Sequence, residues 1–139
     1  MTDGGVRQLR VIVTVDDYDE ALAFYRDALG MPQLAAFASH GGRVSILGAG
    51  RATLELTDRR HAEYIDEVEV GRRVAGKYRI ALEVGDSVAV TERLASAGAT
   101  VVAPPTRTPW DSLNARLEAP GGIQLTLFTE LGDTQDSER

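Results

Sequence analysis

The sequence predicts an α+β fold in which two tandem β-α-β-β-β modules form a curved mixed sheet around a cavity. Two observations predict it. A strand, a helix and a glycine stop occur twice, with corresponding residues 68 or 69 positions apart. Each helix is also followed by three short strand-like runs. The corresponding pairs are Arg10 and Arg79, Asp17 and Asp86, and Gly30 and Gly98.

In the first module, Val11, Val13 and Val15 alternate with Arg10, Ile12 and Thr14. This alternation, in a segment rich in valine, predicts a strand over residues 9–15. We expect Asp17 to cap the next helix, with Glu20 in the capping-box position. The helix should end at Gly30, where a left-handed residue is expected. Its apolar stripe consists of Tyr18, Ala21, Leu22, Tyr25, Ala28 and Leu29. Strands should follow at residues 33–39, 43–47 and 52–57.

The second module repeats this pattern. Residues 78–84 predict a strand, and either Asp86 or Ser87 should cap the helix that follows. Its stripe consists of Val90, Leu94 and Ala97, and Gly98 should end it. Strands are then expected at residues 100–103, 112–118 and 123–129, with the Pro104-Pro105 pair and residues 120–122 as breaks.

We therefore expect one domain over residues 1–139, divided into four segments. Module 1 spans about residues 9–57, a linker spans 58–77, module 2 spans about 78–131, and a frayed acidic tail spans 132–139. Within the linker we expect a short helical turn at about residues 62–68. A four-stranded sheet with a helix on one face leaves its other face uncovered, so the two sheets should lie side by side and enclose a cavity.

Composition excludes several classes of function. The 139 residues suffice to bury about two-thirds of the unfolded surface. The absence of cysteine excludes disulfides and thiolate metal sites. The net charge of -6 argues against nucleic-acid binding, and no apolar run approaches the length of a membrane span. We therefore expect a cytoplasmic protein with neither nucleic-acid nor membrane partners.

Four segments resemble the vicinal oxygen chelate superfamily, which includes glyoxalases, bleomycin-resistance proteins and dioxygenases. They are residues 15–18, the F-Y-x-x-x-L-G signature within residues 23–30, residues 78–84, and Ala119-Pro120-Gly121-Gly122 followed by a strand. The resemblance extends from about residue 9 to residue 131. It implies the paired-module fold and leaves the chemistry open, because this fold carries lyases, epimerases, oxygenases and binding proteins.

The resemblance also implies four cavity-facing positions, which hold a metal ion in metal-dependent relatives. In this sequence they are Arg10, Glu55, Arg79 and Thr126, with Gln124 as the alternative to Thr126 if the register slips by two. Arginine has no lone pair to donate, so we expect no metal ligands and no cofactor. Fixed positive charge should replace the metal.

Arg10 and Arg79 should face the cavity, because successive side chains of a strand alternate. They could pair with Glu55, Glu83 or another carboxylate, or they could bind an anionic oxygen of a ligand. Glu55 is the candidate general base, and its alternative role is that of a salt-bridge partner.

Further candidates lie in the second module and the linker. Trp110 could stack on a ligand or could fill the core or a dimer interface. Asn114 and Arg116 share a strand face with Ser112 and could form a polar cavity wall. We expect His40 to be exposed in a turn, whereas His61, near Tyr64 at the start of the linker, could reach over the cavity mouth. The acidic linker residues Asp66, Glu67 and Glu69 should form a solvated face.

Three functions remain open on this basis. The first is a metal-independent, homodimeric protein that binds a small organic ligand, anionic or aromatic, in the manner of bleomycin-resistance proteins. Its ligand-binding residues would be Arg10, Arg79, Glu55, Trp110, Asn114, Arg116 and Thr126. The second is a lyase, isomerase, epimerase or dioxygenase that uses Glu55 as a base or metal ligand. The third is a protein with a closed cavity that acts through its dimer surface.

Overall fold

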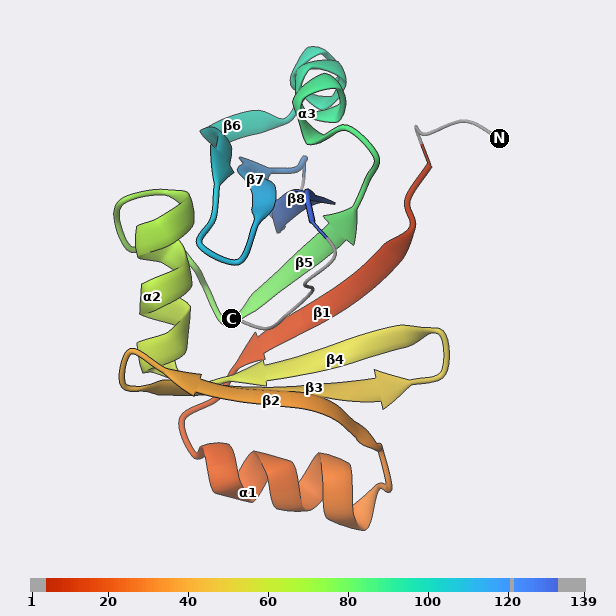
Figure 1. The fold of residues 1–139 in the computed structure, drawn as a ribbon, viewed down its shortest axis with the longest axis vertical. Coiled ribbons are helices and arrows are strands. Elements are labelled where there is room, and N and C mark those ends of the chain that lie inside the picture. The colour runs from red at the N-terminus through yellow and green to blue at the C-terminus, as the bar shows by residue number, and fades with distance from the viewer. Residues whose placement is uncertain (1–4, 121, 133–139) are drawn as a thin grey trace.

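The structure, a computed structural model, describes residues 5–120 and 122–132 (Figure 1). Most of the predicted acidic tail, residues 133–139, lies outside the described residues. The elements are β1 (Gln8–Thr14), α1 (Tyr18–Leu22), the π-helix η1 (Ala23–Ala28), β2 (Gln33–Ser39), β3 (Gly42–Ala49), β4 (Ala52–Thr57), α2 (Arg59–Glu69), β5 (Tyr78–Glu83), α3 (Ser87–Ser96), β6 (Thr100–Arg107), β7 (Ser112–Glu118) and β8 (Gln124–Glu130).

The strands form one eight-stranded mixed sheet in the order β2-β3-β4-β1-β5-β8-β7-β6. In each module the first strand pairs in parallel with the last, β1 with β4 and β5 with β8. The two modules join through the antiparallel pair β1 and β5. The prediction of an α+β fold with tandem β-α-β-β-β modules is therefore confirmed.

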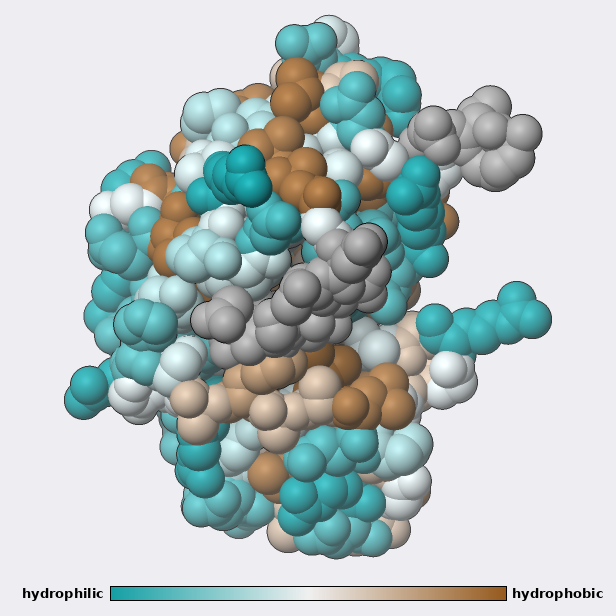
Figure 2. Space-filling view, viewed as in Figure 1, coloured by the Kyte–Doolittle hydropathy of each residue, from teal (hydrophilic) through white to brown (hydrophobic). Residues whose placement is uncertain are grey.

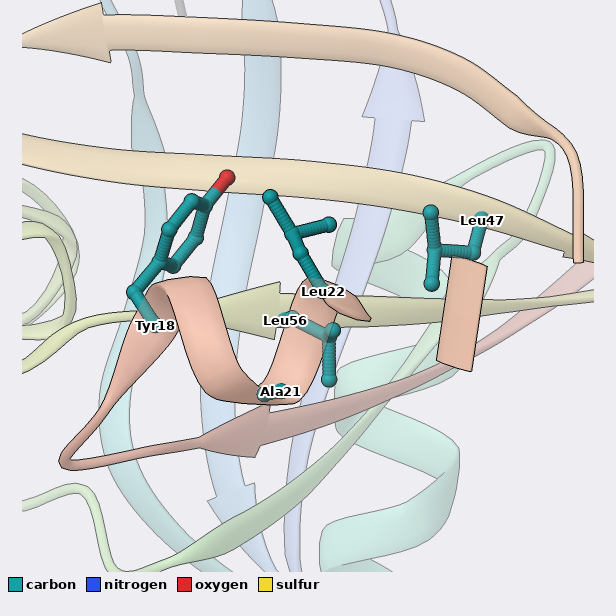
Figure 3. Packing of buried hydrophobic residues seen from close by; sticks show 5 residues of the cluster. All are labelled: Tyr18, Ala21, Leu22, Leu47 and Leu56. Atoms are coloured by element: carbon teal, nitrogen blue, oxygen red, sulfur yellow. The ribbon is translucent and has the colours of Figure 1, made fainter. Parts of the chain in front are cut away.

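Helix α1 covers one face of the first module because its apolar stripe packs on β3 and β4. The backbone N–H of Glu20 donates to Asp17 Oδ1 over 3.0 Å, which confirms the predicted cap. Figure 3 shows Tyr18 and Leu22 pointing from the helix toward these strands. After Leu22 the helix widens into η1, so the single predicted helix has two parts. Gly30 follows with φ at 82°, the left-handed stop that was expected.

Helix α3 covers the second module in the same way. The backbone N–H of Ala89 donates to Asp86 Oδ1 over 3.1 Å, so Asp86 is the cap rather than Ser87. Ser87 instead donates its hydroxyl to the carbonyl oxygen of Leu113 over 2.9 Å. The core beneath the helix consists of Val84, Val90, Ala115, Leu117 and Leu127.

Strand β6 is longer than the sequence predicts. β6 continues through the Pro104-Pro105 pair to Arg107, whereas these prolines were expected to end it. The reason is its place in the sheet. β6 is the last strand in the order, and an edge strand has one side on which proline loses no ladder hydrogen bond.

The linker departs most from the prediction. A short turn was expected, and the structure has an eleven-residue helix, α2, capped by Asp58. Figure 1 shows α2 standing beside both modules, and it contacts β3 of the first and β7 of the second. The prediction of a solvated acidic face is wrong for two of its three residues. Asp66 and Glu69 are each 3% exposed, and only Glu67 points to solvent.

The face of the molecule shown in Figure 2 is mainly polar. Figure 2 shows hydrophilic residues over much of the visible face, with hydrophobic residues in separate groups among them. Within residues 5–120 and 122–132, no helix is long and apolar enough to cross a membrane.

Candidate functional site

The four positions singled out by the resemblance lie on one face of the central strands, the face opposite α1 and α3. In the sheet register, Glu55 of β4 and Arg79 of β5 both lie opposite Ile12 of β1. Arg10 and Thr126 both lie opposite Ala81 of β5. All four are almost completely buried: Arg10 is 7% exposed, Glu55 1%, Arg79 6% and Thr126 1%. The structure therefore brings these predicted residues together beneath α2.

Arg116 is the most deeply buried charge on this face. Its guanidinium is fully buried and lies between two carboxylates of α2. Nη1 donates to Asp66 Oδ1 over 2.8 Å, and Nη2 donates to Glu69 Oε1 over 2.8 Å. Nη1 also donates to Gln124 Oε1 over 3.2 Å. Arg116 thus lies on the same sheet face as Thr126, and its acidic partners come from the linker helix.

The rest of the predicted polar row on β7 also faces α2. Asn114 donates from Nδ2 to Glu69 Oε2 over 2.8 Å, and the Ser112 hydroxyl donates to Asn114 Oδ1 over 2.6 Å. The Thr126 hydroxyl donates to Glu69 Oε1 over 3.2 Å. The face consequently carries a continuous hydrogen-bonded network that ends on the carboxylate of Glu69.

Arg79 and Arg10 differ in their surroundings. Arg79 Nη1 donates to the Thr126 hydroxyl over 2.7 Å. Burial lowers the pKa of Arg79, as does the nearby charge of Arg116, and the carboxylates of Glu69, Glu55 and Asp66 oppose that shift. Arg10 donates from Nε to Gln8 Oε1 over 2.7 Å, and its guanidinium carbon lies 4.8 Å from the centre of the Phe128 ring.

A small cavity remains between this face and α2. Its volume is about 20 Å³, enough for roughly one water molecule. Its lining combines the charged Arg10, Arg79 and Glu69 with the apolar Ile65, Trp110 and Phe128. Helix α2 contributes Ile65 and Glu69 to this lining.

Trp110 of the cavity lining belongs to a group of aromatic side chains. Trp110 is 6% exposed, and its ring centre lies 6.3 Å from that of Tyr64 on α2. Tyr64 in turn stacks on His40, with ring centres 3.8 Å apart. His40 is exposed in its turn, as predicted. Trp110 thus packs against the linker helix as well as lining the cavity.

His61 also belongs to this aromatic group, with its ring centre 6.1 Å from that of Tyr64, and is 1% exposed. Neither of its ring nitrogens has a hydrogen-bond partner among the described residues. Burial lowers the pKa of His61 to about 4, so the ring is neutral at pH 7. His61 is a buried part of the helix interface, whereas the sequence suggested a position over the cavity mouth.

Sequence reasoning did not identify Asp66 and Glu69 as part of the site, although a signal for them was present. His61, Ile65 and Glu69 are spaced by four residues, the spacing of one helix face. Because Glu69 is acidic, this face does not have the apolar pattern from which a buried helix face is predicted.

The donor set does not fit a divalent metal ion. Two of the four positions are arginines, which carry protons on every nitrogen and repel cations. The third is the hydroxyl of Thr126, a weak, uncharged metal ligand whose oxygen already accepts a hydrogen bond from Arg79. Among the described residues, no group of three histidine, cysteine, aspartate or glutamate side chains could hold a metal.

Comparison with known proteins agrees with this architecture. Residues 7–127 match the Glyoxalase/Bleomycin resistance protein/Dioxygenase superfamily. A search of curated protein sequences finds no match.

Solved structures with a similar fold include methylmalonyl-CoA epimerase from Mycobacterium tuberculosis. It is 22% identical, with a TM-score of 0.67, over 95% of this chain and 93% of that one. A variant of the Streptomyces coelicolor epimerase in complex with 2-nitronate-propionyl-CoA is 20% identical, with a TM-score of 0.66, over 92% and 100%. A superfamily member from Vibrio splendidus 12B01 is 11% identical, with a TM-score of 0.62, over 91% and 100%.

The repeated modules, the sheet order and the match over residues 7–127 lead to one assignment. This chain belongs to the Glyoxalase/Bleomycin resistance protein/Dioxygenase superfamily.

Proposed function

We propose that this chain is a metal-independent protein that binds a small organic molecule on the sheet face beneath α2, in the manner of bleomycin-resistance proteins. We also propose that it acts as a homodimer in the cytoplasm. One observation carries the binding proposal. Three buried arginines, Arg10, Arg79 and Arg116, lie on the same face as the apolar rings of Trp110 and Phe128.

This combination suits an anionic or aromatic organic ligand. Guanidinium groups bind planar oxyanions well, and aromatic rings supply apolar area at little cost in conformational entropy. Metal chelation would need donors that the two arginine positions cannot supply. The ligand would therefore be held by charge, hydrogen bonds and stacking.

The size of the cavity sets a condition on binding. A space of about 20 Å³ is far below the roughly 300 Å³ of ordinary small-molecule pockets. A ligand larger than water must therefore displace part of α2 from the sheet. Such a ligand would bind only the fraction of molecules in which the helix has moved.

The test is a thermal-shift screen of small acids and aromatic compounds, followed by calorimetric titration of each compound that stabilises the protein. Arg79→Met should weaken the binding of those compounds at least about tenfold, because it removes a buried cation from the face. Arg51→Met removes an exposed arginine from the β3–β4 turn and is the matched control. The proposal fails if no compound stabilises the protein, or if Arg79→Met and Arg51→Met bind the stabilising compounds with equal affinity.

The metal content of the purified protein is a separate test of the same proposal. We expect divalent metals well below one equivalent, and no change in melting temperature when EDTA is added. Stoichiometric zinc, nickel, iron or manganese, lost together with thermal stability on chelation, would overturn metal independence.

The alternative is an enzyme that uses Glu55 as a general base. It is favoured by the 1% exposure of this carboxylate, on the same face as Arg79, and by the epimerases among the similar folds. An epimerising base would remove a proton next to a carbonyl and allow a solvent proton to replace it. Incubation with methylmalonyl-CoA in D₂O would then exchange that hydrogen, and Glu55→Gln would abolish the exchange. Absence of exchange in the native protein argues against this alternative.

A further inference from the structure

We infer that β7 and β8 form a binding site for a carboxylate, and that Glu69 of α2 occupies this site as a built-in substitute for the ligand. The ligand would be a small organic acid whose carboxylate takes the place of Glu69. The inference rests on the proposed function, because it assumes that the ligand binds beneath α2.

The carboxylate of Glu69 is held as a bound carboxylate ligand would be. Its Oε1 accepts from Arg116 Nε over 3.1 Å and from Nη2 over 2.8 Å, and it also accepts from the Thr126 hydroxyl over 3.2 Å. Its Oε2 accepts from Asn114 Nδ2 over 2.8 Å. Arg116, Asn114 and Thr126 are 0%, 5% and 1% exposed, so these donors meet the carboxylate out of contact with water.

Neighbours within the sheet orient two of these donors, Asn114 and Thr126. Ser112 donates to Asn114 Oδ1, which orients the amide so that its Nδ2 points at Glu69. Arg79 donates to the Thr126 hydroxyl, which leaves that hydroxyl to donate its own proton to the carboxylate. Neighbours on β5 and β7 therefore hold the amide and the hydroxyl of the site in the orientation that a carboxylate requires.

The acceptor, by contrast, lies outside the sheet, at the end of a helix. Glu69 is the last residue of α2, and residues 70–77 beyond it form neither helix nor strand. One turn before this end, Asp66 forms three further polar contacts. Asp66 accepts from Arg116 and from the backbone N–H groups of Val74 and Ala75. A free carboxylate can replace the four hydrogen bonds that Glu69 accepts, while Asp66 retains its two backbone donors within the chain.

The neighbouring cavity indicates the rest of the ligand. Glu69 lines it together with the apolar side chains of Ile65, Trp110 and Phe128. When the Glu69 side chain is displaced, the apolar lining lies directly beside the donor groups of Arg116, Asn114 and Thr126 that it had occupied. The site should therefore prefer a monocarboxylic acid with a small apolar or aromatic body, such as propionate or benzoate, over inorganic anions.

The experiment compares Glu69→Ala with Glu67→Ala. Both variants remove one negative charge from α2, but Glu67 is exposed and lies outside the site. Propionate and benzoate are titrated by calorimetry, with propionamide, benzamide and inorganic phosphate as the other probes. The fluorescence of Trp110, the sole tryptophan, reports the same titration.

Glu69→Ala should bind propionate and benzoate at least about tenfold more tightly than the native protein, because the internal competitor is gone. Glu67→Ala should bind them as the native protein does, and the amides should bind none of the three proteins measurably. If Glu69→Ala is too unstable for calorimetry, propionate should raise its melting temperature more than that of the native protein, and propionamide should not.

Three results would overturn the inference: equal carboxylate affinity in the two variants, amide binding as tight as that of the acids, or phosphate binding tighter than that of propionate. If the screen still finds ligands whose binding depends on Arg79, only the carboxylate site is wrong and the proposed function stands. If no compound binds the native protein or either variant, both fail.

Discussion

Replacing Arg116 with methionine removes the one cation that pairs with both buried carboxylates of α2. The two ion pairs measure 2.8 Å each, and the side chains of Arg116, Asp66 and Glu69 are 0%, 4% and 2% exposed. Breaking a buried pair from one side typically costs about 3–5 kcal/mol, because the remaining charge is left without compensation. Here two carboxylates lose their cation, although Asp66 keeps two backbone N–H donors.

We therefore expect Arg116→Met to lower the free energy of unfolding by about 3–5 kcal/mol. The total free energy of unfolding of a typical domain is roughly 5–15 kcal/mol, so this loss is a large part of it. It corresponds to a fall in melting temperature of about 10–20 °C. Urea unfolding monitored by circular dichroism measures the free energy directly, and calorimetry gives the temperature.

The control is Arg59→Met. Arg59 also forms an ion pair on α2, with Asp16 over 2.9 Å, but its side chain is 67% exposed and that of its partner 79%. Exposed pairs contribute less than about 1 kcal/mol. If Arg116→Met costs no more than Arg59→Met, the buried network does not hold α2 on the sheet, and the reasoning about its electrostatics is refuted.

Three further predictions follow from individual residues. Between pH 7 and pH 4, His61 should account for a loss of about 3 kcal/mol, because its pKa falls from 6.5 in the unfolded chain to about 4 in the fold. As the pH is lowered, the unfolded state binds the proton before the folded state does, so the free energy of unfolding decreases. His61→Phe should remove this contribution to the pH dependence of the free energy measured by urea unfolding. Gly42→Ala would place a Cβ 2.2 Å from the backbone nitrogen of His61. It should destabilise the protein by more than about 2 kcal/mol and shift the emission of Trp110, whereas Gly76→Ala, with nothing within 4 Å of its Cβ, should change neither. Asp86→Ala should cost about 1 kcal/mol in thermal unfolding, since it removes the cap of α3.

The features that could be predicted from the sequence are those that neighbouring residues determine. Asp17 and Asp86 cap their helices through hydrogen bonds to residues three positions later. Gly30 adopts the left-handed conformation that the end of a helix favours. Alternation along β1 and β5 was enough to place Arg10 and Arg79 on the buried face.

The closure of the site could not be predicted in this way, because it depends on distant partners. Arg116 and Glu69 are 47 positions apart, and neither has a local pattern that points to the other. An acidic residue on a linker helix is usually solvated, and its burial becomes favourable only where a sheet already presents a cation and an amide. The charge on β7 therefore explains the burial of α2, and α2 alone does not.

This pairing changes the electrostatic character expected of the cavity. If the arginines simply replaced the positive charge of a metal ion, they would attract an anionic ligand, and no group of the protein would compete with that ligand for them. Instead, the three buried arginines share their face with the carboxylates of Glu55, Asp66 and Glu69, all of them 3% exposed or less. The carboxylates balance the arginine charges from within the chain, so an incoming anion gains favourable charge only by displacing one of them. Affinity for a ligand should then depend less on the overall charge of -6 than on how readily the last turn of α2 releases Glu69.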